Sequence, residues 1–178
     1  SAYNNFKKIV ELDSENIKAY LRLGQVLRES GNTNKALKIH KSLLIRQNLT
    51  SYELNELHKN LALDYFEMNQ FEKAIEETLE ILKTDKKNSW AISQLIIFHK
   101  KLNQWDKTCE YLEKLNKING TSDLHKLGLF IIQEGRNLQN EKKFELARSK
   151  FEKALSVHPN LSSAYFFIAE TFSKESEV

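Results

Sequence analysis

The sequence predicts an all-α protein, a solenoid of tandem helix–turn–helix repeats that coil into a right-handed superhelix. A pattern of one small residue followed by larger apolar residues recurs after 34 positions, at Ala2 and again at Ala36. Within each segment the apolar residues recur at intervals of three and four, which is typical of helices. One proline and five glycines in 178 residues, with 29% charged residues, also favour helices over a sandwich or barrel.

The stretch from Ala19 to Leu43 carries the repeat pattern most completely. Gly24 on its first helix and Ala36 on its second are small, so the two helix backbones can approach closely. Larger residues occupy the flanking signature positions, and these are Tyr20, Leu23, Leu27, His40 and Leu43. This spacing is the signature of the tetratricopeptide repeat, which the chain resembles. A single such repeat cannot bury its apolar face, so neighbouring repeats are expected.

The period divides the whole chain into one array. We predict a half repeat at 1–13, repeats at about 17–50, 51–88, 89–121 and 122–161, and a half repeat at 162–175. Ala2, Phe6 and Ile9 match the second helix of a repeat. We therefore expect a fragment of a longer array, with exposed apolar faces at both ends and self-association through them.

Repeats two and three depart from the standard spacing or composition. Thr50 and Glu53 form a T-x-x-E capping box, which predicts that the first helix of repeat two begins early and runs from Ser51 to Met68. In repeat three Ile96 and Thr108 replace the small pair, so we expect wider helix separation with Trp105 filling the gap.

Repeat four has a longer first helix. We expect it to run from Ser122 to about Glu141, with Gly135 at the small position. Its second helix matches the signature at Ala147 and Phe151.

Composition excludes several classes of function. A net charge of +3, with both signs mixed along the chain, does not favour a nucleic-acid or lipid surface. The apolar runs are far shorter than the ~18 residues of a membrane span. The single cysteine, Cys109, rules out an internal disulfide and favours a reducing, cytoplasmic compartment.

Candidate catalytic and metal-binding residues are equally sparse. No histidine pair has zinc-site spacing, so we predict no enzyme activity, cofactor or metal. Cys109 is expected to be an inert thiol. His40 and His99 occupy apolar signature positions and are predicted to lie in the core, whereas we expect solvated side chains at His58, His125 and His158.

The concave side of a tetratricopeptide array gathers side chains from the first helix of every repeat. The resemblance places thirteen candidate groove residues there: Lys18, Leu21, Gln25, Arg28, Lys59, Leu63, Phe66, Trp90, Ile97, Lys100, Ile132, Arg136 and Phe166. An apolar floor with interleaved basic groups suits a protein segment with apolar anchors and acidic side chains. Alternatively, some of these residues pack against neighbouring repeats. Leu63 and Ile132 fit both interpretations, whereas Trp90 and Phe66 favour partner contact.

A carboxylate clamp of the chaperone-binding type is not expected. Asn60 is suitably placed, but other residue types fill the remaining clamp positions, which are Leu21, Gln25, Trp90 and Gln94.

Three segments resemble bacterial lipopolysaccharide assembly protein B. They are LGQVLRESGNTNKALKIHKSLL (Leu23–Leu44), NLTSYE (Asn48–Glu53) and LALDYFEMNQFEKAIE (Leu61–Glu76). His40, unusual at an aromatic position, matches the Ile-His pair of that family. The resemblance implies an adaptor at the cytoplasmic face of the inner membrane, which brings the deacetylase that commits lipid A synthesis to a membrane protease. The family's membrane helix and rubredoxin-like module would lie outside this fragment. The alternative is a tetratricopeptide scaffold of another bacterial complex.

Overall fold

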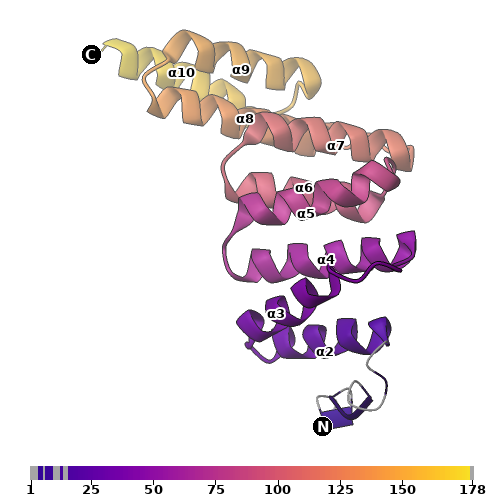
Figure 1. The fold of residues 1–178 in the computed structure, drawn as a ribbon. Coiled ribbons are helices and arrows are strands. Elements are labelled where there is room, and N and C mark those ends of the chain that lie inside the picture. The colour runs from indigo at the N-terminus through magenta and orange to yellow at the C-terminus, as the bar shows by residue number, and fades with distance from the viewer. Residues whose placement is uncertain (1–3, 6, 10–12, 14–15, 177–178) are drawn as a thin grey trace. The chain divides into compact units, whose positions relative to one another are not determined.

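The structure is a computed structural model that describes residues 4, 5, 7–9, 13 and 16–176. The described residues form helices and turns, with no strand among them, which confirms the predicted all-α class (Figure 1). The chain divides into two compact units, residues 1–91 and 92–178, with the boundary inside α6.

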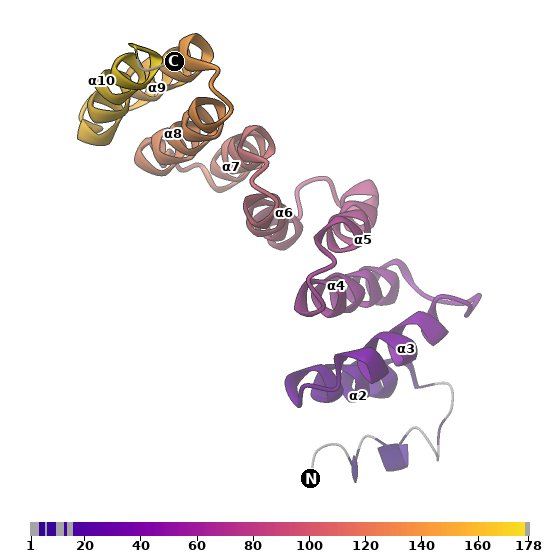
Figure 2. The ribbon, with the colours of Figure 1, turned by 90° about the vertical axis from the view of Figure 1, so that its left-hand side faces the viewer.

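Unit 1 contains the first two repeats and the start of α6. Its helices are α2 (Ile17–Glu29), α3 (Thr33–Leu43), α4 (Ser51–Glu67) and α5 (Phe71–Thr84), followed by the first residues of α6 (Ser89–Lys101). Helix α3 contacts α2 and α4, and α2 also contacts α4 (Figure 2). Residues 4, 5 and 7–9 are helical. Ala2, Phe6 and other parts of the predicted half repeat lie outside the described residues.

Helix α4 begins where its capping box predicts. The Thr50 side chain accepts a hydrogen bond from the Glu53 backbone N–H, and the Glu53 carboxylate accepts from the Thr50 backbone N–H. The helix starts at Ser51 and its last residue, Glu67, immediately precedes the predicted end at Met68. The early start is therefore confirmed.

The turn between the two helices is built the same way in all four complete repeats. One residue adopts a left-handed conformation, with φ of 79° at Gly31, 55° at Asn69, 55° at Asn103 and 61° at Lys142. The backbone N–H that follows donates to the carbonyl five residues earlier, as in Asn32 to Leu27 at 2.8 Å. This is the Schellman ending of a helix. The sequence indicates it by glycine only in the first repeat.

Unit 2 contains the rest of α6, α7 (Trp105–Asn119), α8 (Leu124–Asn140), α9 (Phe144–Val157) and α10 (Ser162–Ser176). Helix α9 contacts both α8 and α10. One core joins these helices, and its buried members include Leu112, Phe130, Ile131, Phe151 and Leu161.

In repeat three, Trp105 contacts the first helix of the next repeat. Its ring centroid lies 5.9 Å from that of Phe130 on α8. Between α6 and α7, the rings of His99 and Tyr111 are stacked, with centroids 5.4 Å apart. Thr108 is fully buried, and its hydroxyl donates to the Gln104 carbonyl of its own helix at 2.9 Å. The wider helix separation, with Trp105 filling the gap, stays a prediction.

None of the described helices combines the length and apolar character needed to cross a membrane. Nor do the described residues contain a group of three or more metal-ligating side chains.

Candidate functional site

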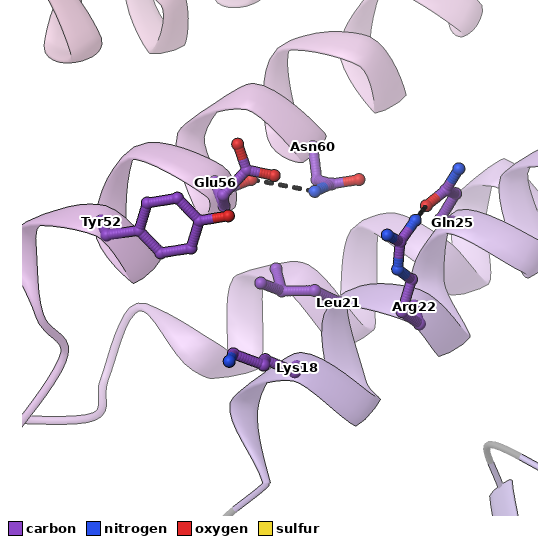
Figure 3. Close-up of a pocket in the computed structure, with 7 residues that line it drawn as sticks. All are labelled: Lys18, Leu21, Arg22, Gln25, Tyr52, Glu56 and Asn60. Carbon is purple, nitrogen blue, oxygen red and sulfur yellow. Dashed lines mark hydrogen bonds between the residues drawn. The ribbon is translucent and has the colours of Figure 1, made fainter.

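Two open pockets lie next to each other on unit 1. The first, of about 140 Å³, lies between α2 and α4 (Figure 3). The second, of about 70 Å³, lies between α4 and the start of α6. Glu56 lines both, so the two pockets adjoin at this residue of α4, and together they are called the pocket strip. The first is lined by Lys18, Leu21, Arg22, Gln25, Tyr52, Glu56 and Asn60, and the second by Asn55, Glu56, Lys59, Ile81, Asn88 and Trp90.

The first pocket has an apolar floor and a polar rim. Leu21 is 8% exposed and belongs to the core beneath the pocket. Arg22 Nη1 donates to Gln25 Oε1 at 2.7 Å, and Gln25 Nε2 donates to Glu29 Oε1 at 2.8 Å. Figure 3 shows Lys18 and Leu21 on one helix opposite Tyr52 and Glu56 on the other. The predicted groove residues Lys18, Leu21 and Gln25 therefore line one pocket.

Lys59 and Trp90 meet in the second pocket. The Lys59 ammonium lies 5.1 Å from the centroid of the Trp90 ring, within the range of a cation–π interaction. The same ammonium lies 3.4 Å from Glu56 Oε1. Both predicted groove residues are half-buried, so each presents part of its side chain to solvent.

Arg28, another candidate groove residue, is held in an ion pair with Asp64. Its Nη1 donates to Asp64 Oδ1 at 2.7 Å and to the Asn60 carbonyl at 3.2 Å, while Nη2 donates to Asn60 Oδ1 at 3.2 Å. Only 11% of its side chain is exposed. Arg28 therefore links α2 to α4 instead of facing a partner directly. The sequence does not reveal this ion pair, because Asp64 lies 36 residues after Arg28.

The other unit 1 candidates contribute less to the pockets. Leu63 and Phe66 are half-buried, and the Phe66 ring centroid lies 5.6 Å from that of Phe71. Neither residue lines the two pockets described above. Their role in partner contact stays a prediction.

In unit 2 one candidate groove residue lies in the core and four are accessible. Ile132 is 2% exposed, so of the two interpretations left open for it, packing against neighbouring helices holds and partner contact does not. Ile97 is 40% and Phe166 63% exposed. The exposed Lys100 ammonium lies 5.3 Å from the Phe130 ring centroid, and the exposed Arg136 guanidinium lies 5.1 Å from that of Phe167.

Helix α10 also exposes Tyr165 and Phe172, at 59% and 57%. Self-association through such faces stays a prediction.

The histidine predictions hold in part. His40 and His99 are buried, as predicted. His58 is 13% exposed in its side chain and its Nδ1 lies 2.7 Å from Glu77 Oε2, so its predicted solvation is wrong. The prediction of a solvated side chain is also wrong for His158, which is half-buried. Its ring centroid lies 5.1 Å from that of the exposed His125.

The thiol of Cys109 matches its prediction as an inert group. Burial raises the pKa of Cys109 to about 12, and the nearby carboxylates Glu134 and Glu113 act in the same direction. A thiol that stays protonated is a poor nucleophile.

Curated relatives with the same name align along nearly the whole chain. Lipopolysaccharide assembly protein B of Haemophilus influenzae is 31% identical over 162 residues, which are 89% of this chain and 40% of that protein. The Escherichia coli K12 protein is 19% identical over 176 residues, 99% of this chain and 45% of that protein. The chain thus spans less than half the length of these relatives. No family model matches the sequence.

Solved tetratricopeptide structures share the fold. A tetratricopeptide repeat protein from Parabacteroides merdae superposes with a TM-score of 0.59 at 17% identity, covering 96% of this chain and 64% of the other. YrrB, described as a tetratricopeptide protein with an unusual peptide-binding site, gives 0.55 at 20% identity and covers 96% and 84%. These similarities confirm the predicted repeat fold.

Proposed function

We propose that this tetratricopeptide chain, which resembles lipopolysaccharide assembly protein B, is a noncatalytic adaptor that binds an acidic, extended partner segment along unit 1. The pocket strip on α2 and α4 is the observation that carries the proposal. Lys18, Arg22 and Lys59 outnumber the one carboxylate that lines the strip, Glu56. Leu21 and Trp90 supply apolar contact. A partner with acidic groups and apolar anchors complements this surface.

The resemblance suggests the biological setting. We propose that the chain acts in the regulation of lipopolysaccharide synthesis at the cytoplasmic face of the inner membrane, where it recruits the deacetylase that commits lipid A synthesis to a membrane protease. The exposed unit 2 candidates Ile97, Lys100, Arg136 and Phe166 would add further contacts. The second candidate function is a scaffold of another bacterial complex, which the same peptide-binding surface would also serve.

The test uses overlapping peptides that cover the deacetylase sequence. Their binding to the chain is measured by fluorescence anisotropy, for the native sequence and for a double variant, Lys18→Glu with Arg22→Glu. The matched control is Lys35→Glu with Lys38→Glu, which makes the same charge change at exposed positions on α3.

The proposal predicts that acidic peptides bind the native chain and the α3 control, but bind the α2 variant at least about tenfold more weakly. Added salt should weaken the binding, because exposed charges are screened. Equal affinities for the two double variants would exclude this surface. If no deacetylase peptide binds, but acidic peptides from another bacterial complex do, the scaffold function is favoured.

A further inference from the structure

The side-chain amide of Asn60, in the first pocket, can adopt only one orientation. Its Oδ1 accepts from Arg28 Nη2 at 3.2 Å, and its Nδ2 donates to the Glu56 carbonyl at 2.9 Å. A guanidinium only donates and a carbonyl only accepts, so exchanging the amide oxygen and nitrogen would break both contacts. The Asn60 amide thus keeps one further N–H at the pocket for an acceptor.

The buried pair of Asp64 and His40 holds the Arg28 guanidinium in place. Asp64 is fully buried, and its two carboxylate oxygens have different partners. Oδ1 lies 2.7 Å from Arg28 Nη1, and Oδ2 lies 2.5 Å from Nδ1 of His40, which is also fully buried. The Arg28 guanidinium therefore has a fixed carboxylate behind it and a pocket residue, Asn60, in front of it.

His40 connects this hydrogen-bond network, formed by Asn60, Arg28 and Asp64, to a second residue of the pocket. Its Nε2 lies 3.3 Å from the backbone carbonyl of Leu21, another pocket residue. Both ring nitrogens of His40 thus face groups that only accept hydrogen bonds. The network runs through three helices and ends at pocket residues on both sides.

We propose that Arg28 is a positioning residue for the partner site, held by the Asp64–His40 pair, and that it directs the Asn60 N–H at a backbone carbonyl of the bound segment. The role as a partner site rests on the proposed function above. Stability alone does not account for such a network, since well-packed apolar residues of similar size usually do as well as a buried ion pair. Hydrogen-bond donors that are already held in their bound orientation lower the entropic cost of binding a partner.

The first experiment needs no partner. In ¹⁵N-labelled chain, the side-chain NH₂ signal of Asn60 is identified by its loss in Asn60→Asp, and its mobility is measured by the heteronuclear NOE. Arg28→Lys keeps the charge beside Asp64 but loses the planar fork that reaches Asn60. We expect the Asn60 amide to become mobile in Arg28→Lys and to stay rigid in the control Arg22→Lys.

The second experiment measures affinity for the tightest-binding peptide of the deacetylase set. Arg28→Lys should weaken binding by about tenfold, whereas the matched control Arg148→Lys, which changes an ion-paired arginine outside both pockets, should bind within about twofold of the native chain. If Arg28→Lys does not fold, Asn60→Ala serves instead, because it removes the donor without adding a charge that would itself repel an acidic partner. It should weaken binding to a similar extent.

A rigid Asn60 amide in Arg28→Lys, or unchanged affinity in both Arg28→Lys and Asn60→Ala, would overturn the positioning role. If no peptide binds the native chain, the proposed function fails, whereas the amide measurement still decides whether Arg28 orders Asn60.

Discussion

Gly24 on α2 lies directly beneath the imidazole of His40 on α3, so that a Cβ atom at Gly24 would fall 2.2 Å from His40 Nε2. The ring therefore occupies the space that a side chain on α2 would otherwise take. Gly135 and Phe151 repeat this relationship in unit 2, where a Cβ would fall 2.5 Å from Phe151 Cε1. In both repeats a glycine on the first helix admits a ring from the second.

The first prediction is that Gly24→Ala destabilises unit 1 by about 2 kcal/mol, the range for overpacking a tight core. The His40 ring cannot move aside easily, because both its nitrogens contact other groups. Helix propensity alone would give the opposite sign, since alanine is about 1 kcal/mol better than glycine in a helix. Urea unfolding followed by circular dichroism measures the difference, with Lys38→Ala on the exposed face of α3 as control. A stabilised Gly24→Ala chain would contradict the packing described here.

The second prediction ranks two glycines of α8. A Cβ at Gly135 would clash with the rigid ring of Phe151 at 2.5 Å, whereas at Gly128 the one clash would be with the terminal methyl Cδ1 of Leu161 at 2.4 Å. A methyl at the end of a rotatable side chain can move, but a ring buried on all sides cannot. We expect Gly135→Ala to lower the thermal midpoint more than Gly128→Ala. The reverse order would show that Leu161 is the less adaptable neighbour.

The fold could be predicted from sequence because its signals are local and periodic. The capping box of α4 lies within four consecutive residues, from Thr50 to Glu53, and its geometry follows directly from those residue types. The small residues Gly24 and Gly135 likewise mark helix contacts at a fixed spacing.

The site could be predicted only in part, because its chemistry depends on contacts between distant residues. The pairing of Arg28 with Asp64 and the burial of Ile132 arise from packing across repeats, which the period of the sequence does not specify. His58 looked solvated because Glu77, its partner, lies on the next helix.

The third prediction concerns Lys142, which has a left-handed conformation with φ of 61° in the turn between α8 and α9. Glycine or asparagine occupies the matching place in the other repeats. This conformation costs an ordinary L-residue about 1 kcal/mol or more. Lys142→Gly should therefore stabilise unit 2 by up to about 1 kcal/mol in urea unfolding, while Lys143→Gly, at the residue that follows, should not. A destabilised Lys142→Gly chain would contradict the turn geometry.

The fourth prediction concerns the cap of α4. Thr50→Ala removes the side-chain acceptor for the Glu53 backbone N–H and should cost about 1 kcal/mol at neutral pH. In the native chain, hydrogen bonds from the Thr50 hydroxyl and then from its backbone N–H lower the pKa of Glu53. A lowered pKa stabilises the fold above the unfolded pKa and loses this effect as the pH falls through the folded pKa.

The stability difference between the native chain and Thr50→Ala should accordingly be largest near neutral pH and should shrink as the pH falls below about 4. Unfolding midpoints measured across this range provide the test. Ser51→Ala, one residue further along, is the control and should show no such pH dependence. A difference that stays constant with pH would mean that the Thr50 hydroxyl does not contact the ionised Glu53 side chain.

The fifth prediction uses the only cysteine in the sequence, Cys109, as a probe of the unit 2 core. Burial raises its pKa to about 12, so at pH 8 its thiolate fraction is on the order of a thousandfold below that of a free thiol. Alkylation by iodoacetamide should be correspondingly slow in the folded chain and fast in urea. The folded rate should rise about tenfold per pH unit without levelling off between pH 8 and 10, because the thiol does not reach half-ionisation there. A plateau near pH 9 would show instead that Cys109 is open to solvent and that α7 does not pack as described.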